Sequence, residues 1–217
     1  ERAALAFAGG YFGGKSGGRA ALRNWNPGVS DANGDISPDL VDLRAYSRDL
    51  ARRSPLAGGA INTVVTSVIG TGLALEPAPD AEFLGLRDDE AAKWQEDVMR
   101  EWKLWAESLN CDSTRTQNIY GLQSLAFRSA LESGDVFAIT PVINRPNSPY
   151  GLSIQLIEAD RVCNPGNAAD SAIITAGVET DDFGAPVAYH ISRQHPGARM
   201  MRGNQTWDRI LAFGENT

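Results

Sequence analysis

The sequence has few of the residues on which metal sites, disulfide frameworks and many active sites depend. Only two cysteines and two histidines occur in 217 residues. Cys111 and Cys163 are too few for a disulfide framework and fit a reducing compartment. Neither has a base close in sequence that would make it a nucleophile. His190 and His195 lack a third ligand nearby, so we expect no metal, no cofactor and no catalytic residue.

Long apolar runs and positive charge are also scarce. No segment reaches the roughly 18 uninterrupted apolar residues that span a bilayer, so we expect no membrane partner. The N-terminus lacks the basic region and continuous apolar run of a signal peptide. Lys and Arg number 20 against 27 Asp and Glu, which gives a net charge of −7. Because phosphate binding depends on Lys and Arg, this balance disfavours a nucleic-acid clamp but permits a protein that surrounds DNA without gripping it.

Glycine, by contrast, is abundant, and one glycine-rich pattern imitates a nucleotide site. Residues 9–16 fit G-x-x-x-x-G-K-[ST], from Gly9 to Ser16. A working P-loop needs a buried strand before it and a helix after it, whereas Gly17 and Gly18 disfavour a helix. We favour a chance match within a flexible Gly-rich arm over residues 1–36. A P-loop nucleotide-binding enzyme is the alternative.

Two capped helices are predicted within residues 37–72. Ser37-Pro38 and Ser54-Pro55 each place a capping serine before a proline at the first helical position. Gly70 is placed to end the second helix in a left-handed conformation. The first helix carries Arg44, Arg48 and Arg52 on one stripe, while the second is almost uncharged. We predict that the three arginines contact a neighbouring subunit, the alternative being a solvated face with intrahelical ion pairs.

A third helix opens at Asp88 and places three tryptophans on one face: Trp94, Trp102 and Trp105. We predict that they pack in the core or against another subunit. They could instead stack on bases, but the acidic residues of the same helix would repel a phosphate backbone. A fourth helix is predicted over residues 117–132, with Leu125 among its inward residues and Gly134 as its stop.

The pattern then changes from helix to strand. Residues 136–143 and 152–157 are predicted strands, residues 173–179 and 186–191 a hairpin, and residues 207–213 a further strand. Helices followed by antiparallel strands indicate an α+β fold rather than a βαβ repeat. The predicted organisation is therefore an arm over residues 1–36, a helical part over residues 37–134 and a β-rich part over residues 135–217.

Several segments, in order, resemble the lambda-type portal proteins of tailed phages. They are LRAYSRDL (43–50) leading to IGTG (69–72), WKLWAESLNCD (102–112), LESGDV (131–136), LIEADRV (156–162) and GVETDDFGAPVAYH (177–190). The chain departs from the family pattern at Ala45-Tyr46, where a second basic residue is expected. The resemblance covers only the N-terminal portion of such proteins, the peripheral wing, and implies that the stem, clip and crown lie beyond this chain.

The resemblance implies a structural protein and not an enzyme. Portal subunits assemble into a ring of about twelve copies at one capsid vertex, the head-tail connector of the virion. Double-stranded DNA passes through the ring without sequence-specific contacts during packaging and ejection. The implied partners are other copies of the chain, the terminase, head-tail connector proteins and the major capsid protein. The implied location is the virion, with the host cytoplasm during assembly.

Overall fold

The computed structural model describes residues 31–198 and 205–213, and it divides the chain into residues 1–39 and 40–217. In the first unit, helix α1 (Ala32–Ile36) is followed by the 3-10 turn η2 (Ser37–Asp39). Asp31 caps α1 by accepting a hydrogen bond from the Gly34 amide at 2.8 Å. The predicted cap at Ser37 is wrong, because Ser37 is itself helical, with φ −56° and ψ −40°. The glycine-rich pattern of residues 9–16 lies outside the described residues.

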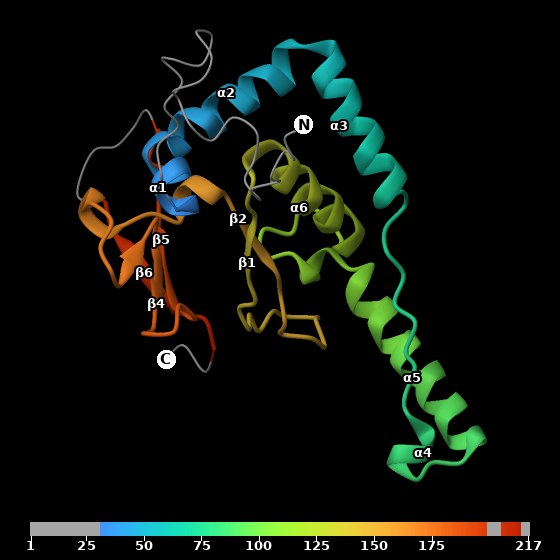
Figure 1. The fold of residues 1–217 in the computed structure, drawn as a ribbon. Coiled ribbons are helices and arrows are strands. Elements are labelled where there is room, and N and C mark those ends of the chain that lie inside the picture. Colours follow the sequence, from blue (N-terminus) through green and yellow to red (C-terminus); the bar gives the residue numbers. More distant parts are fainter. Residues whose placement is uncertain (1–30, 199–204, 214–217) are drawn as a thin grey trace, which may run out of the picture. The chain divides into compact units, whose positions relative to one another are not determined.

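The second unit begins with helices α2 (Leu40–Arg53) and α3 (Pro55–Val68), which pack against each other (Figure 1). The predicted boundary between them is confirmed, because Ser54 Oγ accepts the Ala57 amide at 3.3 Å and Pro55 starts α3. Gly58 allows the close approach: a Cβ there would lie 2.8 Å from the Ala51 carbonyl oxygen. Gly70 follows α3 with φ +56°, as predicted.

An extended segment then leads to the short helix α4 (Ala81–Leu84) and the long helix α5 (Asp88–Ala106), which starts where the acidic residues predicted. The turn η3 (Leu109–Cys111) connects α5 to α6 (Ile119–Ser133). Gly134 ends α6 with φ +83°. Leu73 is tied to α6, because its amide donates to Gln123 Oε1 at 2.7 Å.

The remaining elements form two antiparallel sheets, so the α+β prediction is confirmed. Strands β1 (Phe137–Ile139) and β2 (Gln155–Ile157) pair with Phe137 opposite Ile157. The second sheet has the order β3-β4-β5-β6 and comprises Ile174–Thr175, Val178–Thr180, Pro186–Ser192 and Trp207–Leu211. The predicted strand over residues 173–179 is broken between β3 and β4, because Ala176 and Gly177 both have positive φ. The turns η4 (Ala159–Arg161) and η5 (Pro165–Asn167) connect the two sheets.

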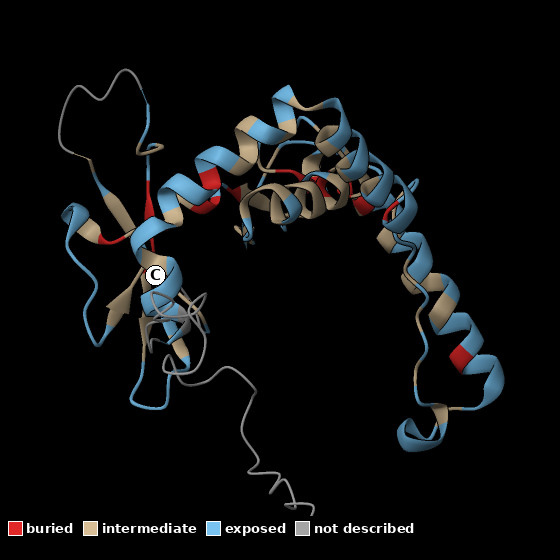
Figure 2. Cartoon of the chain, turned by 45° about the horizontal axis from the view of Figure 1, so that its top comes forward, coloured by how far each residue is buried: buried red, intermediate tan, exposed pale blue. Residues whose placement is uncertain are grey.

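Among the described residues, most of the buried apolar side chains fall in two small clusters, and many other positions are exposed (Figure 2). The first lies between α5, η3 and α6 and contains Ala106, Cys111, Ile119 and Leu122. The second lies between the sheets and contains Ile157, Val162 and Ile191. The prediction that Leu125 points inward is wrong: it is 40% exposed, one turn beyond the part of α6 that the first cluster covers.

Candidate assembly site

Arg44 connects α2 to three distant parts of the chain. Its Nη2 donates to Asp135 Oδ2 at 2.7 Å, its Nε to the Ser133 carbonyl at 3.2 Å and its Nη1 to the Ala159 carbonyl at 3.4 Å. The residue is only 8% exposed. A buried guanidinium needs such acceptors, because its desolvation is costly. Arg44 therefore holds α2 against the C-terminal end of α6 and the start of η4.

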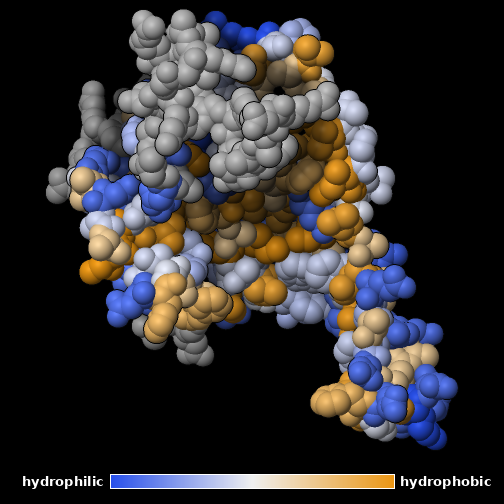
Figure 3. All heavy atoms as spheres, in the orientation of Figure 1, coloured by the Kyte–Doolittle hydropathy of each residue, from blue (hydrophilic) through white to orange (hydrophobic). Residues whose placement is uncertain are grey.

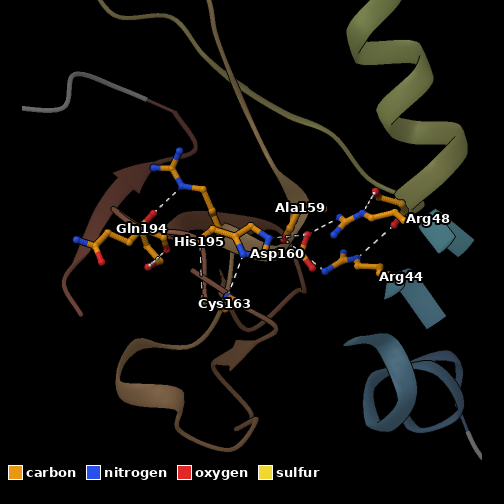
Figure 4. Close-up of polar contacts among 11 residues, drawn as sticks. Arg44, Arg48, Ala159, Asp160, Cys163, Gln194 and His195 are labelled. Carbon is orange, nitrogen blue, oxygen red and sulfur yellow. Dashed lines mark hydrogen bonds and ion pairs between the residues drawn. The ribbon is translucent and has the colours of Figure 1, made fainter. Parts of the chain in front are cut away.

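Arg48 extends the same network one turn along α2. Its Nε donates to Ser133 Oγ at 3.0 Å, and its Nη2 forms an ion pair with Asp160. Figure 4 shows Arg44 and Arg48 directed toward Ala159 and Asp160. Arg52 differs from both, since its side chain is exposed and its Nε donates only to the Arg48 carbonyl at 3.0 Å. The predicted stripe thus exists, but its first two members are used within the chain.

Asp160 lies between this network and the loop after β5. Burial alone would raise the pKa of Asp160, but the hydrogen bond and positive charge of Arg48 outweigh it and hold that pKa below its usual value. His195 Nε2 approaches the same carboxylate at 3.7 Å. Next to it, Arg161 Nε donates to the Ser192 carbonyl of β5 at 2.8 Å. The arginines of α2 and the second sheet therefore meet at η4.

The acidic partners of the arginines were not predicted as site residues. Asp135 and Asp160 lie in the segments LESGDV and LIEADRV, which carry part of the resemblance described above. Three segments that are far apart in sequence thus meet at one point. All three segments resemble the same protein family, and this was the only sign in the sequence that they are related. The spacing of the residues does not indicate that they are in contact.

The three tryptophans of α5 occupy different environments. Trp102 and Trp105 are half-buried against the first core cluster, with ring centroids 5.2 Å apart. The indole N–H of Trp105 donates to the Leu152 carbonyl at 2.9 Å. Trp94 is 47% exposed, because it lies two turns before the part of α5 that packs on the cluster. Contacts within the chain thus support the predicted packing of Trp102 and Trp105. For Trp94, packing stays a prediction.

A second polar centre organises the connection between α5 and α6. Asp112 is buried and accepts the amides of Thr114 at 2.9 Å and Thr116 at 3.0 Å, together with both hydroxyls. Burial would raise the pKa of Asp112, but these hydrogen bonds lower it to about 2. Arg145 closes the loop by donating to the Asp112 and Ser113 carbonyls.

His190 contacts one carboxylate, and Cys111 lies beside another. His190 Nε2 lies 3.2 Å from Glu179 Oε2, and Arg209 holds the same carboxylate through two contacts of 2.8 Å. Arg209 is the main cause that lowers the pKa of Glu179 to about 2. Burial, with the charge of Asp112, raises the pKa of the Cys111 thiol. Within residues 31–198 and 205–213, no three His, Cys, Asp or Glu side chains gather as a metal site.

Apolar side chains are prominent on the surface of the helical part. In α3, Leu56 is 85% exposed and Val68 51% exposed, and none of its residues is buried. Figure 3 shows hydrophobic residues gathered along α3 and a smaller apolar patch at α4. Phe83 of α4 is 85% exposed and its neighbour Leu84 57% exposed. No helix in the described part of the chain has the length and apolar character needed to cross a membrane.

Comparisons with known proteins find phage portal proteins. The phage portal proteins of the lambda family match residues 18–215. Portal protein B of Escherichia phage lambda is 28% identical over 203 residues, which is 91% of this chain and 37% of the relative. The portal protein of Escherichia phage N15 is 25% identical over 193 residues, covering 87% of this chain and 36% of the relative. The probable portal protein of Halomonas phage phiHAP-1 is 28% identical over 187 residues, covering 85% and 35%.

The chain spans little more than a third of the length of these curated relatives. The family match nevertheless takes in nearly all of the chain, including the three segments that meet at the arginine network. The chain belongs to the lambda family of phage portal proteins.

Proposed function

We propose that the protein is a structural portal subunit. In this role it forms part of a ring at one capsid vertex, through which double-stranded DNA is packaged and ejected. The observation that carries the proposal is the family match over residues 18–215. Since the chain spans about a third of its relatives, ring formation and DNA passage are proposed for the whole protein of which this region is a part.

The surface of the described region suits a subunit that other copies cover. Rings of identical subunits need two different surfaces that meet head to tail. The exposed apolar residues of α3 and α4 supply surface of the kind that protein partners bury. We propose other copies of the chain, about twelve in a ring, as the first partners. Terminase, head-tail connector proteins and the major capsid protein are the others, in the virion and, during assembly, in the host cytoplasm.

Of the three arginines predicted at a subunit boundary, Arg52 is the best candidate. Its side chain is exposed, and it has no carboxylate partner among the described residues. Arg44 and Arg48 direct their guanidinium groups to acceptors within the chain. We propose that Arg52 contacts an acidic face of the next subunit, in line with the chain's excess of 27 acidic over 20 basic residues.

Electron microscopy of the full-length protein tests the proposed function directly. We expect closed rings with a central channel, and mass photometry should give one dominant assembly. A protein that stays monomeric at micromolar concentration, without rings on grids, would contradict the proposal. Calorimetry with ATP and magnesium separates it from the nucleotide-binding alternative: we expect no heat of binding, whereas binding abolished by Lys15→Ala would support that alternative.

A further inference from the structure

An apolar cavity lies where α5 meets α6 and the segment after α3. Its volume is about 430 Å³, and its walls include Leu75, Met99, Trp102 and Tyr120. A neighbouring hollow of about 330 Å³ continues along α5 past Leu104. The cavity is large enough for two apolar side chains and is within the size range of ligand pockets.

The rim of this cavity carries two basic residues, and the acidic Glu107 borders the second hollow. Arg100 and Lys103 border both hollows. Arg100 is already paired with Asp97 at 2.9 Å on its own helix. Lys103 has no carboxylate partner among the described residues, and its side chain is exposed. An occupant with an apolar tip and one acidic residue beside it would therefore complement the cavity in both shape and charge.

The same chain presents such an element at α4. Phe83 and Leu84 are adjacent and exposed, and Glu82 precedes them without a cation partner in the described part of the chain. The turn is held in place at both ends. Asp80 Oδ1 accepts the Phe83 amide at 3.0 Å, and Gly85 closes the turn with φ +65°. Phe83 and Leu84 therefore project from an ordered turn, which reduces the entropy lost on docking.

The α4 turn cannot reach the cavity of its own chain. It is connected to the first residue of α5, Asp88, whereas Trp102 lies 14 residues further along the same unbroken helix. At a rise of 1.5 Å per residue, this separation is about 21 Å. Figure 1 shows α4 at the end of α5 that is remote from α6. The occupant must therefore come from a second molecule.

We propose that Phe83 and Leu84 of one copy insert into the Trp102–Tyr120 cavity of the next copy, with Glu82 paired to Lys103. This inference rests on the proposed portal function and names one of its subunit contacts. The two surfaces lie at different places on the chain, so the contact is head-to-tail and repeats around a ring. Phe183 is the competing occupant, since it is 97% exposed and follows Asp181-Asp182. Its neighbours in sequence are Asp182 and Gly184, however, so it offers a single ring to a cavity that has room for two side chains.

A charge exchange in the full-length protein tests the pairing. Glu82→Lys and Lys103→Glu should each raise the concentration needed for half-maximal ring formation about tenfold, because each reversal replaces an attraction with a repulsion between like charges. Combining the two changes in one chain should restore assembly, because every interface then regains an opposite pair. Phe83→Ala should impair assembly without lowering the melting temperature of the monomer, and Phe183→Ala is the matched control that should assemble normally.

Cysteine cross-linking tests the geometry in a Cys163→Ser background. Leu84→Cys and Met99→Cys in one chain should give a ladder of disulfide-linked oligomers under mild oxidation. Non-reducing gels separate the two possible bonds, because an intrachain disulfide leaves the chain at its monomer mass whereas the proposed contact gives dimers and larger species. The pair Phe183→Cys and Met99→Cys is the control and should stay uncrosslinked.

The outcomes separate this contact from the proposed function. Rings that form normally in all the variants, with no cross-linked ladder, would overturn the contact and leave the portal function standing. Cross-linking through the Phe183 pair instead would overturn it in favour of the other occupant. Failure of the unmodified protein to form rings would reject the portal function, and the proposed contact with it.

Discussion

Helices α2 and α3 have the same length and opposite character, and their burial is the reverse of what composition suggests. α2 (Leu40–Arg53) is rich in charge, yet it contains a buried residue, Arg44. α3 (Pro55–Val68) has no charged residue, yet none of its residues is buried. The charged helix is therefore joined to the rest of the unit by polar contacts, and the apolar helix is left with an open face.

The position of the arginines explains why polar contacts can hold α2 against the rest of the unit. Arg44 and Arg48 both donate to Ser133, the last residue of α6. The carbonyl groups at a helix C-terminus lack intrahelical partners and favour positive charge. Arginine can also pack its apolar stem while directing several donors to fixed acceptors. Polar residues thus stabilise this unit at points where its small apolar clusters do not reach.

Among the polar contacts, the largest expected effect comes from removing Arg44. Arg44→Ala leaves the Ser133 and Ala159 carbonyls without their side-chain donor and creates a void beside α2, so we expect the free energy of unfolding to fall by about 2–4 kcal/mol. Urea denaturation of the monomer measures this difference. Arg53→Ala is the matched control on the same helix. Its guanidinium is 82% exposed and paired only with Asp49, so its loss should change stability by less than about 0.5 kcal/mol. Equal effects of the two changes would refute the comparison.

The second prediction concerns Asp112, the other buried polar centre. Its pKa in the folded chain is about 2, against an ordinary value of 3.8 for an aspartate side chain. Because folding lowers this pKa, the carboxylate stabilises the fold above about pH 4, and that stability is lost as the pH falls from 4 toward 2. The difference corresponds to about 2 kcal/mol.

Asp112→Asn should remove most of this contribution at pH 7 and flatten the loss of stability below pH 4. Thermal unfolding between pH 2 and pH 7 measures both effects. Control measurements on Asp97→Asn, a half-exposed carboxylate of α5 that is paired with Arg100, should follow the unmodified protein. A curve for Asp112→Asn that runs parallel to the unmodified one would show that another carboxylate governs the acid transition.

Much of the fold was predictable because its signals are local. Ser54-Pro55, Gly70 and Gly134 end or begin helices through contacts with residues a few positions away. The β4–β5 hairpin likewise surrounds a turn that its own sequence specifies, where Asp181 Oδ1 accepts the Phe183 and Ala185 amides. Ser37 misled the prediction because a capping residue and a proline fit equally well inside a helical turn that starts earlier, at Asp31.

The arginine network was not predictable in the same way. Arg44 contacts Asp135 and Ala159 across 91 and 115 positions, and no periodicity relates them. The stripe was recognised, but helical spacing gives only a shared face and cannot identify what that face contacts. The tryptophan stripe shows the same limit, since Trp94 and Trp102 share a face while only Trp102 reaches the core. The spacing of residues in one helix shows which side chains share a face. The segment that this face contacts depends on how distant parts of the chain pack.

The third prediction sharpens the comparison from the apolar side. Leu56 of α3 is 85% exposed, so Leu56→Gln should alter the unfolding free energy of the monomer by less than about 0.5 kcal/mol. Leu122→Ala is the contrasting variant. Its side chain is only 4% exposed in the first core cluster, and its truncation should cost about 2–5 kcal/mol. Both values follow from chemical denaturation. A loss of more than 1 kcal/mol in Leu56→Gln would mean that α3 is covered within the chain.

The smallest expected effect on the monomer is that of Arg52, the arginine at the open end of the stripe. Arg52→Gln keeps a good helix former and removes one charge from the last turn of α2, so its stability should fall by only a few tenths of a kcal/mol. Arg48→Glu should behave differently, because it places a carboxylate against Asp160 and loses the bond to Ser133 Oγ. Thermal unfolding followed by circular dichroism should therefore give a lowered melting temperature for Arg48→Glu and an unchanged one for Arg52→Gln.

Ring yield gives the complementary measurement. In the full-length protein, Arg52→Gln should lower the yield of rings on sizing chromatography. Raised salt should lower the yield more for the unmodified protein than for the variant. Salt screens the charge contact between subunits, and the variant has already lost that contact. Arg53→Gln, with the same change of charge one position along, is the control. If Arg52→Gln and Arg53→Gln assemble equally well, the outer end of the stripe is a solvated face. The arginines of α2 would then serve only the fold of their own chain, through Arg44 and Arg48.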